Sequence, residues 1–208
     1  MLHLETVEPH TFSILKQLIA IPALKDFSLV GGTALSLCYG HRVSVDLDLF
    51  SNKPFENQEV IDALKSEFSD RFLMEEKAPR FGIFCYIDNV KTDIVRHPHP
   101  LIRPEQTIEG IRMFSIEDII AMKGQAILGR GKKKDFWDIA ELLQHYSVED
   151  FALFHKEKYT TQNLLISVPQ ALTYFADADE SEDPVSLKNQ TWDGVKQFIT
   201  AKVRAFLK

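Results

Sequence analysis

The chain has 208 residues, of which 45% are hydrophobic and 26% charged, which is ordinary for a globular protein with one well-buried core. Its formal net charge of -6 argues against a general nucleic-acid binder, because neutralising phosphates requires an excess of Lys and Arg. The N-terminal segment carries acids and no apolar stretch, and no run approaches the roughly 18 apolar residues of a membrane span. Cys38 and Cys85 have no CxxC partner. We therefore expect a cytoplasmic protein with free thiols and no membrane contact.

The first half of the chain predicts both helices and strands. Helices are expected where apolar residues recur every three or four positions, over 9–18, 33–39 and 57–68. Strands are expected over 27–30, 43–50, 81–87 and 90–96. Asp88-Asn89 joins the last two as a hairpin turn. In the stretch 43–50, apolar and polar residues alternate, which predicts one wet face that carries Ser44, Asp46 and Asp48.

The second half predicts helices almost throughout. Ser115 is placed to cap a helix that ends near Gly129. Further helices are expected over 135–146, 151–158, 163–175 and 192–207. The fold class is therefore α+β: a small mixed sheet with flanking helices over residues 1–112, followed by a helical C-terminal part over 113–208.

The central chemical pattern is Gly31-Gly32-Thr33, followed by Asp46-x-Asp48. Two acids at i and i+2 on a strand point to the same face, and magnesium prefers such carboxylates together with substrate phosphates. The glycines allow backbone N–H groups to approach a phosphate closely, and the helix that follows directs its positive end to the same place. This order of elements predicts a site for a triphosphate and a metal ion, whereas either motif alone is commonly a solvated strand edge or a turn.

Asp93 is a candidate for a third metal ligand. It lies on the strand predicted over 90–96, and a neighbouring strand could bring its carboxylate beside Asp46 and Asp48. Three acids could hold two metal ions. The alternative is that Asp93 ends a hairpin face in water.

A second group of charged residues follows on the predicted helices of the second half. Lys123 and Arg130 share a helical face, and Asp135 and Asp138 share a face of the next helix. A lysine so placed can stabilise phosphate charge. From spacing alone, the better explanation is a solvated basic loop over 130–134 with Asp135 as a helix cap. His97 and His99 lie in an extended His-Pro-His-Pro loop without a third ligand, so they predict a loop and not a metal site.

Four motifs in order resemble the nucleotidyltransferase toxins of the AbiEii/AbiGii family, within the DNA polymerase β-like superfamily. These motifs are LVGGTAL at 29–35, HRVSVDLDLF at 41–50, AMKGQAILGR at 121–130 and KKDFWD at 133–138. The resemblance spans about residues 27–143 and makes 1–112 the nucleotidyltransferase core. The wider superfamily usually has Gly-Ser where this chain has Gly32-Thr33, and Thr keeps the hydroxyl.

The resemblance implies roles for individual residues. Catalytic roles would fall to Asp46, Asp48, Lys123 and Asp138, phosphate contacts to Gly31, Gly32 and Thr33, and Mg²⁺ or Mn²⁺ binding to Asp46 and Asp48. Asp93 is added as the third metal ligand from its predicted strand, without a distinctive motif, and Arg130 is added to the nucleotide contacts from its helical face. It also implies a nucleoside triphosphate substrate and an antitoxin partner. Some family members modify tRNA.

Three functions remain to be compared. The first is nucleotidyl transfer from a nucleoside triphosphate, with tRNA as the expected acceptor, since Arg130-Gly-Lys-Lys-Lys134 could guide a phosphate strand beside the site. A protein hydroxyl is the alternative acceptor. The second is a DxD glycosyltransferase, which requires a larger α/β region before its acids. The third is a non-enzymatic binding protein of the same fold, against which the intact acids and lysine argue.

Overall fold

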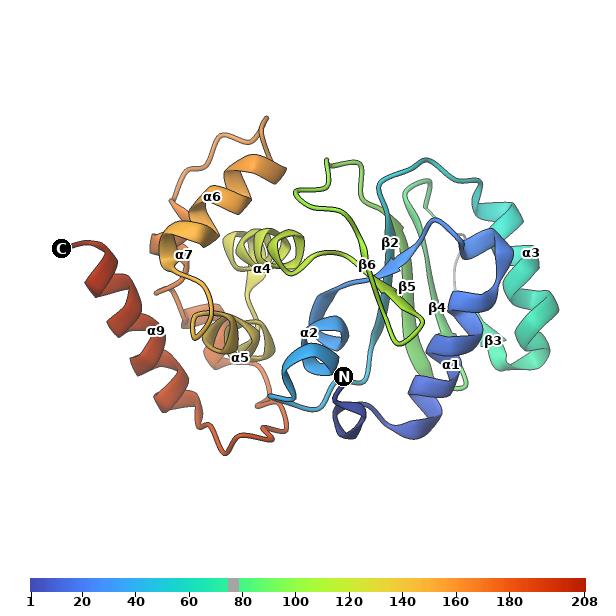
Figure 1. Cartoon of the computed structure of the whole chain (residues 1–208), viewed down its shortest axis with the longest axis horizontal. Coiled ribbons are helices and arrows are strands. Elements are labelled where there is room, and N and C mark those ends of the chain that lie inside the picture. Colours follow the sequence, from blue (N-terminus) through green and yellow to red (C-terminus); the bar gives the residue numbers. More distant parts are fainter. Residues whose placement is uncertain (75–78) are drawn as a thin grey trace.

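The computed structural model describes residues 1–74 and 79–208. One seven-stranded sheet lies beside a bundle of helices that the second half of the chain supplies (Figure 1). This is the mixed sheet with flanking helices and a helical C-terminal part that the sequence predicts. The boundary expected at 112/113 falls inside the strand Ile111–Met113, and the division into two domains stays a prediction.

The sheet has the strand order β3-β4-β5-β2-β1-β7-β6. Its strands are β1 Ser28–Leu29, β2 Leu47–Ser51, β3 Phe72–Leu73, β4 Gly82–Ile87, β5 Val90–Arg96, β6 Gln106–Ile108 and β7 Ile111–Met113. β2 runs parallel to β5, and β1 runs parallel to β7, while the other neighbouring pairs are antiparallel. β4 and β5 form the expected hairpin because Asp88 and Asn89 both adopt positive φ, at 48° and 65°, as a two-residue hairpin turn requires.

Helices cover the two faces of the sheet unequally. α1 (Pro9–Ala20) and α3 (Asn57–Phe68) lie on one side, and α2 (Gly31–Tyr39) lies on the other, between the sheet and the helical part (Figure 1). Short 3-10 helices occupy Leu4–Thr6, Pro22–Leu24 and Ser69–Arg71. The sequence predicts the bounds of α3 correctly, because its buried residues recur at helical spacing: Val60, Ile61, Leu64 and Phe68.

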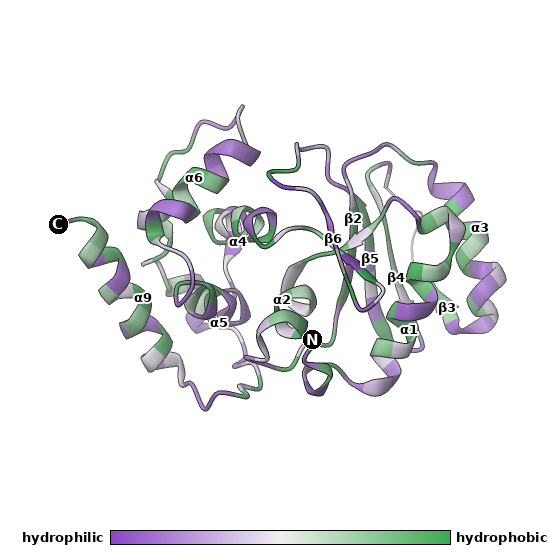
Figure 2. Cartoon of the chain, viewed as in Figure 1, coloured by the Kyte–Doolittle hydropathy of each residue, from purple (hydrophilic) through white to green (hydrophobic). Residues whose placement is uncertain are grey.

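The helical part contains α4 (Ile116–Arg130), α5 (Lys133–Leu142), α6 (Val148–Lys158), α7 (Val168–Ala171), α8 (Ala176–Asp179) and α9 (Trp192–Phe206). Ser115 caps α4 as expected, since its Oγ accepts from the Asp118 backbone N–H at 3.1 Å. Figure 2 shows α9 with a hydrophobic and a hydrophilic side, and its buried residues are Val195, Ile199 and Val203. Among the described residues, no helix has the length and hydropathy needed to cross a membrane.

Three predicted elements differ from the structure. The strand expected over 43–50 is formed only at Leu47–Ser51, and Val45 is 63% exposed, so the alternation that predicts the strand is not matched by burial. The helix expected over 163–175 is one turn, α7, because Ser167 with Gln170 forms a capping box that starts the helix late. The helix expected to end near Gly129 continues through this residue as α4. A side chain at Gly129 would face open space.

Candidate active site

The centre of the candidate site is a pair of carboxylates on neighbouring parallel strands. Asp48 of β2 lies directly opposite Asp93 of β5 in the strand register. Both carboxylates therefore lie on the sheet face opposite α1 and α3. Asp93 lies beside Asp48, which is the first of the two positions considered for it from the sequence. Burial, and then the charge of Asp93, raises the pKa of Asp48 to about 6.

Asp93 has a cation on one oxygen and nothing on the other. Lys91 Nζ donates to its Oδ2 at 2.6 Å. Its Oδ1 is buried and has no hydrogen-bond partner among the described residues. A buried carboxylate oxygen without a partner is costly unless a cation or a donor completes it. The pair Asp48–Asp93 thus has the local charge and the free oxygen that a divalent cation would use.

Gly31 allows the start of α2 to approach Asp48. Its φ is +69°, and a Cβ built on it would lie 2.6 Å from Asp48 Oδ2. Both the conformation and the space therefore require glycine at this position. The helix expected over 33–39 begins two residues earlier, because the structure places both glycines in the first turn of α2. The positive end of this helix lies beside the carboxylate.

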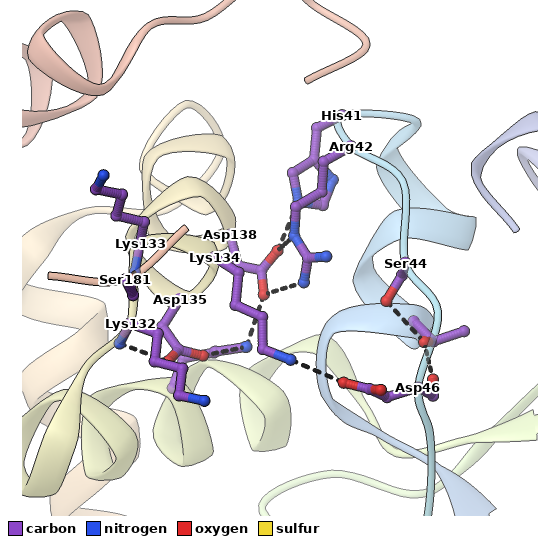
Figure 3. A network of polar contacts seen from close by, with 12 residues as sticks. His41, Arg42, Ser44, Asp46, Lys132, Lys133, Lys134, Asp135, Asp138 and Ser181 are labelled. Atoms are coloured by element: carbon purple, nitrogen blue, oxygen red, sulfur yellow. Dashed lines mark hydrogen bonds and ion pairs between the residues drawn. The ribbon is translucent and has the colours of Figure 1, made fainter. Parts of the chain in front are cut away.

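Thr33 and Asp46 are tied to the segment before β2. The Thr33 hydroxyl is buried, hydrogen-bonds Ser44 Oγ at 2.8 Å and donates to the Asp46 carbonyl. It holds this segment against α2, and its expected role as a phosphate donor stays a prediction. The Asp46 side chain precedes the strand and accepts from Lys134 Nζ at 2.8 Å (Figure 3).

A cavity of about 510 Å³ opens beside Asp46. Its walls come from residues 42–46, from Lys132 and Lys134 at the start of α5, and from the acidic loop 180–185. Lys134 on one wall meets the Asp46 carboxylate on another, while Glu180, Glu182 and Asp183 add negative charge to the third. Asp46 is the residue through which the described lining includes a proposed metal ligand.

A fully buried charge network anchors the segment that leads into β2. Asp138 of α5 accepts from Arg42 through both oxygens, from Nε at 2.7 Å and from Nη2 at 2.9 Å, and from His41 Nε2 at 2.7 Å (Figure 3). Gly32 makes room for this arginine, because a Cβ there would collide with Arg42 Nη2. The sequence analysis assigns no role to His41 or Arg42. The basic pair His41-Arg42 just before the predicted strand indicates that these residues need a partner, but it does not identify Asp138, 96 residues away.

Lys123 belongs to the same network. Its Nζ lies 2.6 Å from Asp138 Oδ2 and 2.8 Å from Asp135 Oδ1. Burial lowers the pKa of Lys123, but Asp135 and Asp138 outweigh burial and raise it overall. Burial likewise raises the pKa of Asp138, but Arg42 and Lys123 outweigh it and hold that pKa well below its usual range. Both groups are charged at neutral pH and hold α4 and α5 against the segment before β2.

The remaining predicted residues lie around this core. Arg130 is exposed at the end of α4 and makes no hydrogen bond or ion pair within the described chain. Lys133 pairs with Asp183 at 2.7 Å, so part of the expected basic run is neutralised. His97 and His99 pack against Tyr159 with ring centroids 5.9 Å and 4.6 Å away, and burial lowers the pKa of His97 to about 3. Both histidines lie in a loop, as the sequence predicts, and they pack against Tyr159 there.

The donor chemistry of the site fits a divalent metal ion. Within residues 1–74 and 79–208, no group of three or more His, Cys, Asp or Glu side chains is already gathered as a metal site. However, carboxylates are the ligands that Mg²⁺ prefers, and Asp48, Asp93 and Asp46 supply them. The ammonium group of Lys91 contacts Asp93, and that of Lys134 contacts Asp46. These ammonium groups lie where a cation would bind.

Comparison with known proteins gives relatives along nearly the whole chain. The family model described as "Nucleotidyl transferase AbiEii toxin, Type IV TA system" matches residues 13–190. An uncharacterized protein of Aquifex aeolicus, aq_aa25, is 32% identical over 201 residues, which cover 93% of this chain and 94% of that protein.

Solved structures agree in fold. A putative nucleotidyltransferase from H. pylori has a TM-score of 0.57 at 20% identity and covers 95% of both chains. The nucleotidyltransferase toxin MenT4 from Mycobacterium tuberculosis has a TM-score of 0.61 at 12% identity and covers 95% of this chain and 86% of its own. At these identities the likeness concerns the fold alone. The family model, which matches most of the chain, places it in the AbiEii family of nucleotidyltransferase toxins.

Proposed function

We propose that this nucleotidyltransferase uses a divalent metal ion to transfer a nucleoside monophosphate from a nucleoside triphosphate to RNA, with tRNA as the expected acceptor. The observation that carries the proposal is the Asp48–Asp93 pair beside the first turn of α2. Two carboxylates held close together and shielded from water repel each other, and one buried oxygen of Asp93 has no partner among the described residues. This arrangement is unfavourable unless a cation binds between them.

Asp46, Asp48 and Asp93 would hold the metal. Bound Mg²⁺ or Mn²⁺ would neutralise charge on the phosphate oxygens and favour the attack of an acceptor hydroxyl on the α-phosphorus. The bond from that phosphorus to the pyrophosphate oxygen breaks in the same step, and the hydroxyl proton is released. Lys91 now contacts Asp93, and Lys134 contacts Asp46. Once these carboxylates bind the metal, each lysine can pair with a phosphate oxygen instead.

The triphosphate is assigned to the cavity beside Asp46. Lys132 and Lys134 line it, and the first turn of α2 supplies backbone N–H groups near Asp48. Lys123 and Asp138 act from behind this wall. They fix Arg42, and through it the chain that carries Asp46, so we assign them a positioning role in place of the direct contact expected from the resemblance.

The Type IV toxin–antitoxin description of the family supports an antitoxin partner. The acceptor RNA is proposed from the basic residues beside the site. The basic run that ends at Lys134 supports RNA only in part, because Lys133 and Lys134 are each paired with an acid. Arg130 and Lys132 are the exposed members of the run, and Lys132 lines the cavity.

The test is transfer of label from each of the four nucleoside triphosphates, labelled on the α-phosphate, into a total cell extract with Mg²⁺ or with EDTA. We expect labelled RNA in the tRNA size range, sensitive to ribonuclease and absent with EDTA. Asp48→Asn should abolish it, whereas Asp26→Asn, an exposed carboxylate paired with Lys53, should not. Label found only in ribonuclease-resistant protein bands would refute the RNA acceptor. Transfer that survives EDTA would refute the metal.

A further inference from the structure

The open face of the sheet carries exposed aromatic rings as well as the carboxylates. Along β4, the residues Ile83, Cys85 and Ile87 are buried on the side of α1 and α3, while Phe84 and Tyr86 are 41% and 40% exposed on the other side. Exposed rings on a regular strand are unusual because each forgoes the stabilisation that burial would give. Neither ring has a role in the transfer chemistry described above.

The strand register places these rings in line with the carboxylates. Phe84 lies directly opposite Asp93, which lies directly opposite Asp48, across β4, β5 and β2. Neighbouring strands are about 4.8 Å apart, so Phe84 is two strands, roughly 10 Å, from Asp48. Tyr86 lies opposite Lys91, the lysine that contacts Asp93. A molecule that reaches the carboxylate pair along this face therefore passes over Phe84 and Tyr86.

Basic residues flank the rings. Lys91 is exposed at the Tyr86 end. Arg80 is exposed at the other end, next to Phe81, whose ring packs edge-on to that of Phe84 with centroids 5.8 Å apart. Arg96 shares the strand face of Thr92 and Ile94 and therefore points away from the rings. In a chain with a formal charge of -6, a lysine and an arginine beside exposed rings are a local feature. Cations at the margins and rings at the centre form the arrangement that single-stranded nucleic acids bind.

We propose that Phe84 and Tyr86 form a stacking platform for unpaired bases of the acceptor RNA and so lead its end to the carboxylate pair. This inference rests on the proposed function, and it adds that the acceptor presents a single strand at the site. Bases within a duplex already have both faces covered by their neighbours, whereas unpaired bases can stack on an aromatic ring. Along β4, the two rings lie about 7 Å apart, since they are two residues apart on a strand.

A docked protein is the other kind of occupant. The direct line from Phe84 to the carboxylates favours RNA, because a protein partner at this position would cover the catalytic acids. The flanking Lys91 and Arg80 favour it too, since their charges match a phosphate backbone. Unpaired bases need the flat faces of the rings, whereas a protein can pack against any apolar side chain at these positions. The two occupants therefore differ in how much their binding weakens when the rings are replaced by leucine.

The experiment measures RNA binding without catalysis, in EDTA and without nucleotide. The probes are a fluorescent pool of random-sequence single-stranded RNA and a fluorescent duplex of the same length. The key variant replaces both rings, Phe84→Leu with Tyr86→Leu, which keeps apolar volume but removes the stacking surface. Phe84→Tyr with Tyr86→Phe keeps both rings. Tyr174→Leu, which changes a 53% exposed ring in the tail, is the matched control.

We expect the full chain to bind the single strand more tightly than the duplex. The double leucine variant should weaken single-strand binding at least tenfold, because each base–ring stack changes affinity about 5- to 100-fold. The ring-exchange variant and Tyr174→Leu should bind as the unchanged chain does. The rise in melting temperature caused by ATP with Mg²⁺ should be the same in all of them.

Three results would overturn the platform. One is undiminished single-strand binding by the double leucine variant, and another is equal binding of duplex and single strand, which includes no binding of either. The third is a loss of the ATP-induced rise in melting temperature, which would assign the rings to the nucleotide base. None of these readouts requires turnover, so a failure of the platform is distinct from a failure of nucleotidyl transfer in the extract assay.

Discussion

The buried charge network around Asp138 provides the sharpest test of how this site is held together. Asp138 is completely buried and faces three groups, Arg42, Lys123 and His41. Asp138→Asn keeps the shape of the side chain and removes its charge. Arg42 then loses one side of its bidentate pair, and Lys123 keeps only Asp135.

The expected loss of stability is large. Removing one partner of a buried ion pair typically costs about 3–5 kcal/mol, because a buried charge is left uncompensated. For a chain of this size, each kcal/mol lowers the melting temperature by about 2–4 °C, so we expect a decrease of roughly 6–20 °C. Asp135→Asn should cost only about 1 kcal/mol, since Asp135 is partly exposed and acts mainly as the cap of α5.

Asp138 and Lys123 should not themselves make the difference between unchanged protein and Asp138→Asn depend on pH near neutrality. The pKa of Asp138 is lowered in the folded state, so its contribution is complete above the unfolded value of about 3.9 and is lost only as pH falls through the folded pKa. The pKa of Lys123 is raised, so its contribution is complete below about 10.4 and is lost as pH rises through the folded pKa. A stability difference that varies between about pH 5 and 9 would therefore be assigned to His41, the third group that contacts Asp138.

Thermal unfolding of unchanged protein, Asp138→Asn and Asp135→Asn at several pH values measures all three expectations. Urea unfolding at 25 °C gives the free energies directly. If Asp138→Asn melts within about 2 °C of the unchanged protein, less than one kcal/mol is at stake and the network does not anchor the site. If the two variants lose equal stability, burial is not the cause.

The remaining predictions concern the carboxylates, a second buried pair and the basic loop. Asp48→Asn should abolish labelled transfer while the melting temperature stays equal or rises, because repulsion with Asp93 is relieved; a lowered melting temperature would show that Asp48 is structural. Lys158→Met should cost about 3–5 kcal/mol in urea unfolding, because Asp118 is fully buried opposite it, and combining it with Asp118→Asn should cost less than the sum; additive losses would show that the pair is not coupled. Lys132→Ala should lower the slope of RNA affinity against salt by about one charge; an unchanged slope would place Lys132 away from the RNA.

The sequence predicts elements well where local signals suffice. The helix Asn57–Phe68 follows its apolar spacing, and the hairpin follows Asp88-Asn89, whose residue types tolerate positive φ. It predicts poorly where tertiary contacts decide. Residues 43–46 alternate like a strand but do not pair as one, because the Val43 N–H bonds the carbonyl of Val185 and the Ser44 N–H bonds that of Thr6.

The candidate site shows the same division. The i, i+2 spacing predicts a wet strand face for Asp46 and Asp48, but Asp46 precedes β2 and Asp48 is partly buried beside Gly31. The sequence cannot show that Arg42 meets Asp138, because charge alone does not choose among distant partners. Nor does it reveal the exposed rings of Phe84 and Tyr86, since alternating aromatic residues on a strand predict burial as readily as exposure.

The charged residues explain how the two halves of the chain keep their parts of the candidate site in fixed relative positions. The carboxylates come from the sheet, yet the segment that leads into β2 is fixed by Asp138 of α5 through Arg42. Lys134, one turn earlier on α5, contacts Asp46. A rigid shift of α5 would therefore move the buried anchor and the cavity wall together. Because a buried bidentate pair tolerates little displacement, the helical half sets the position of Asp46 relative to Asp48.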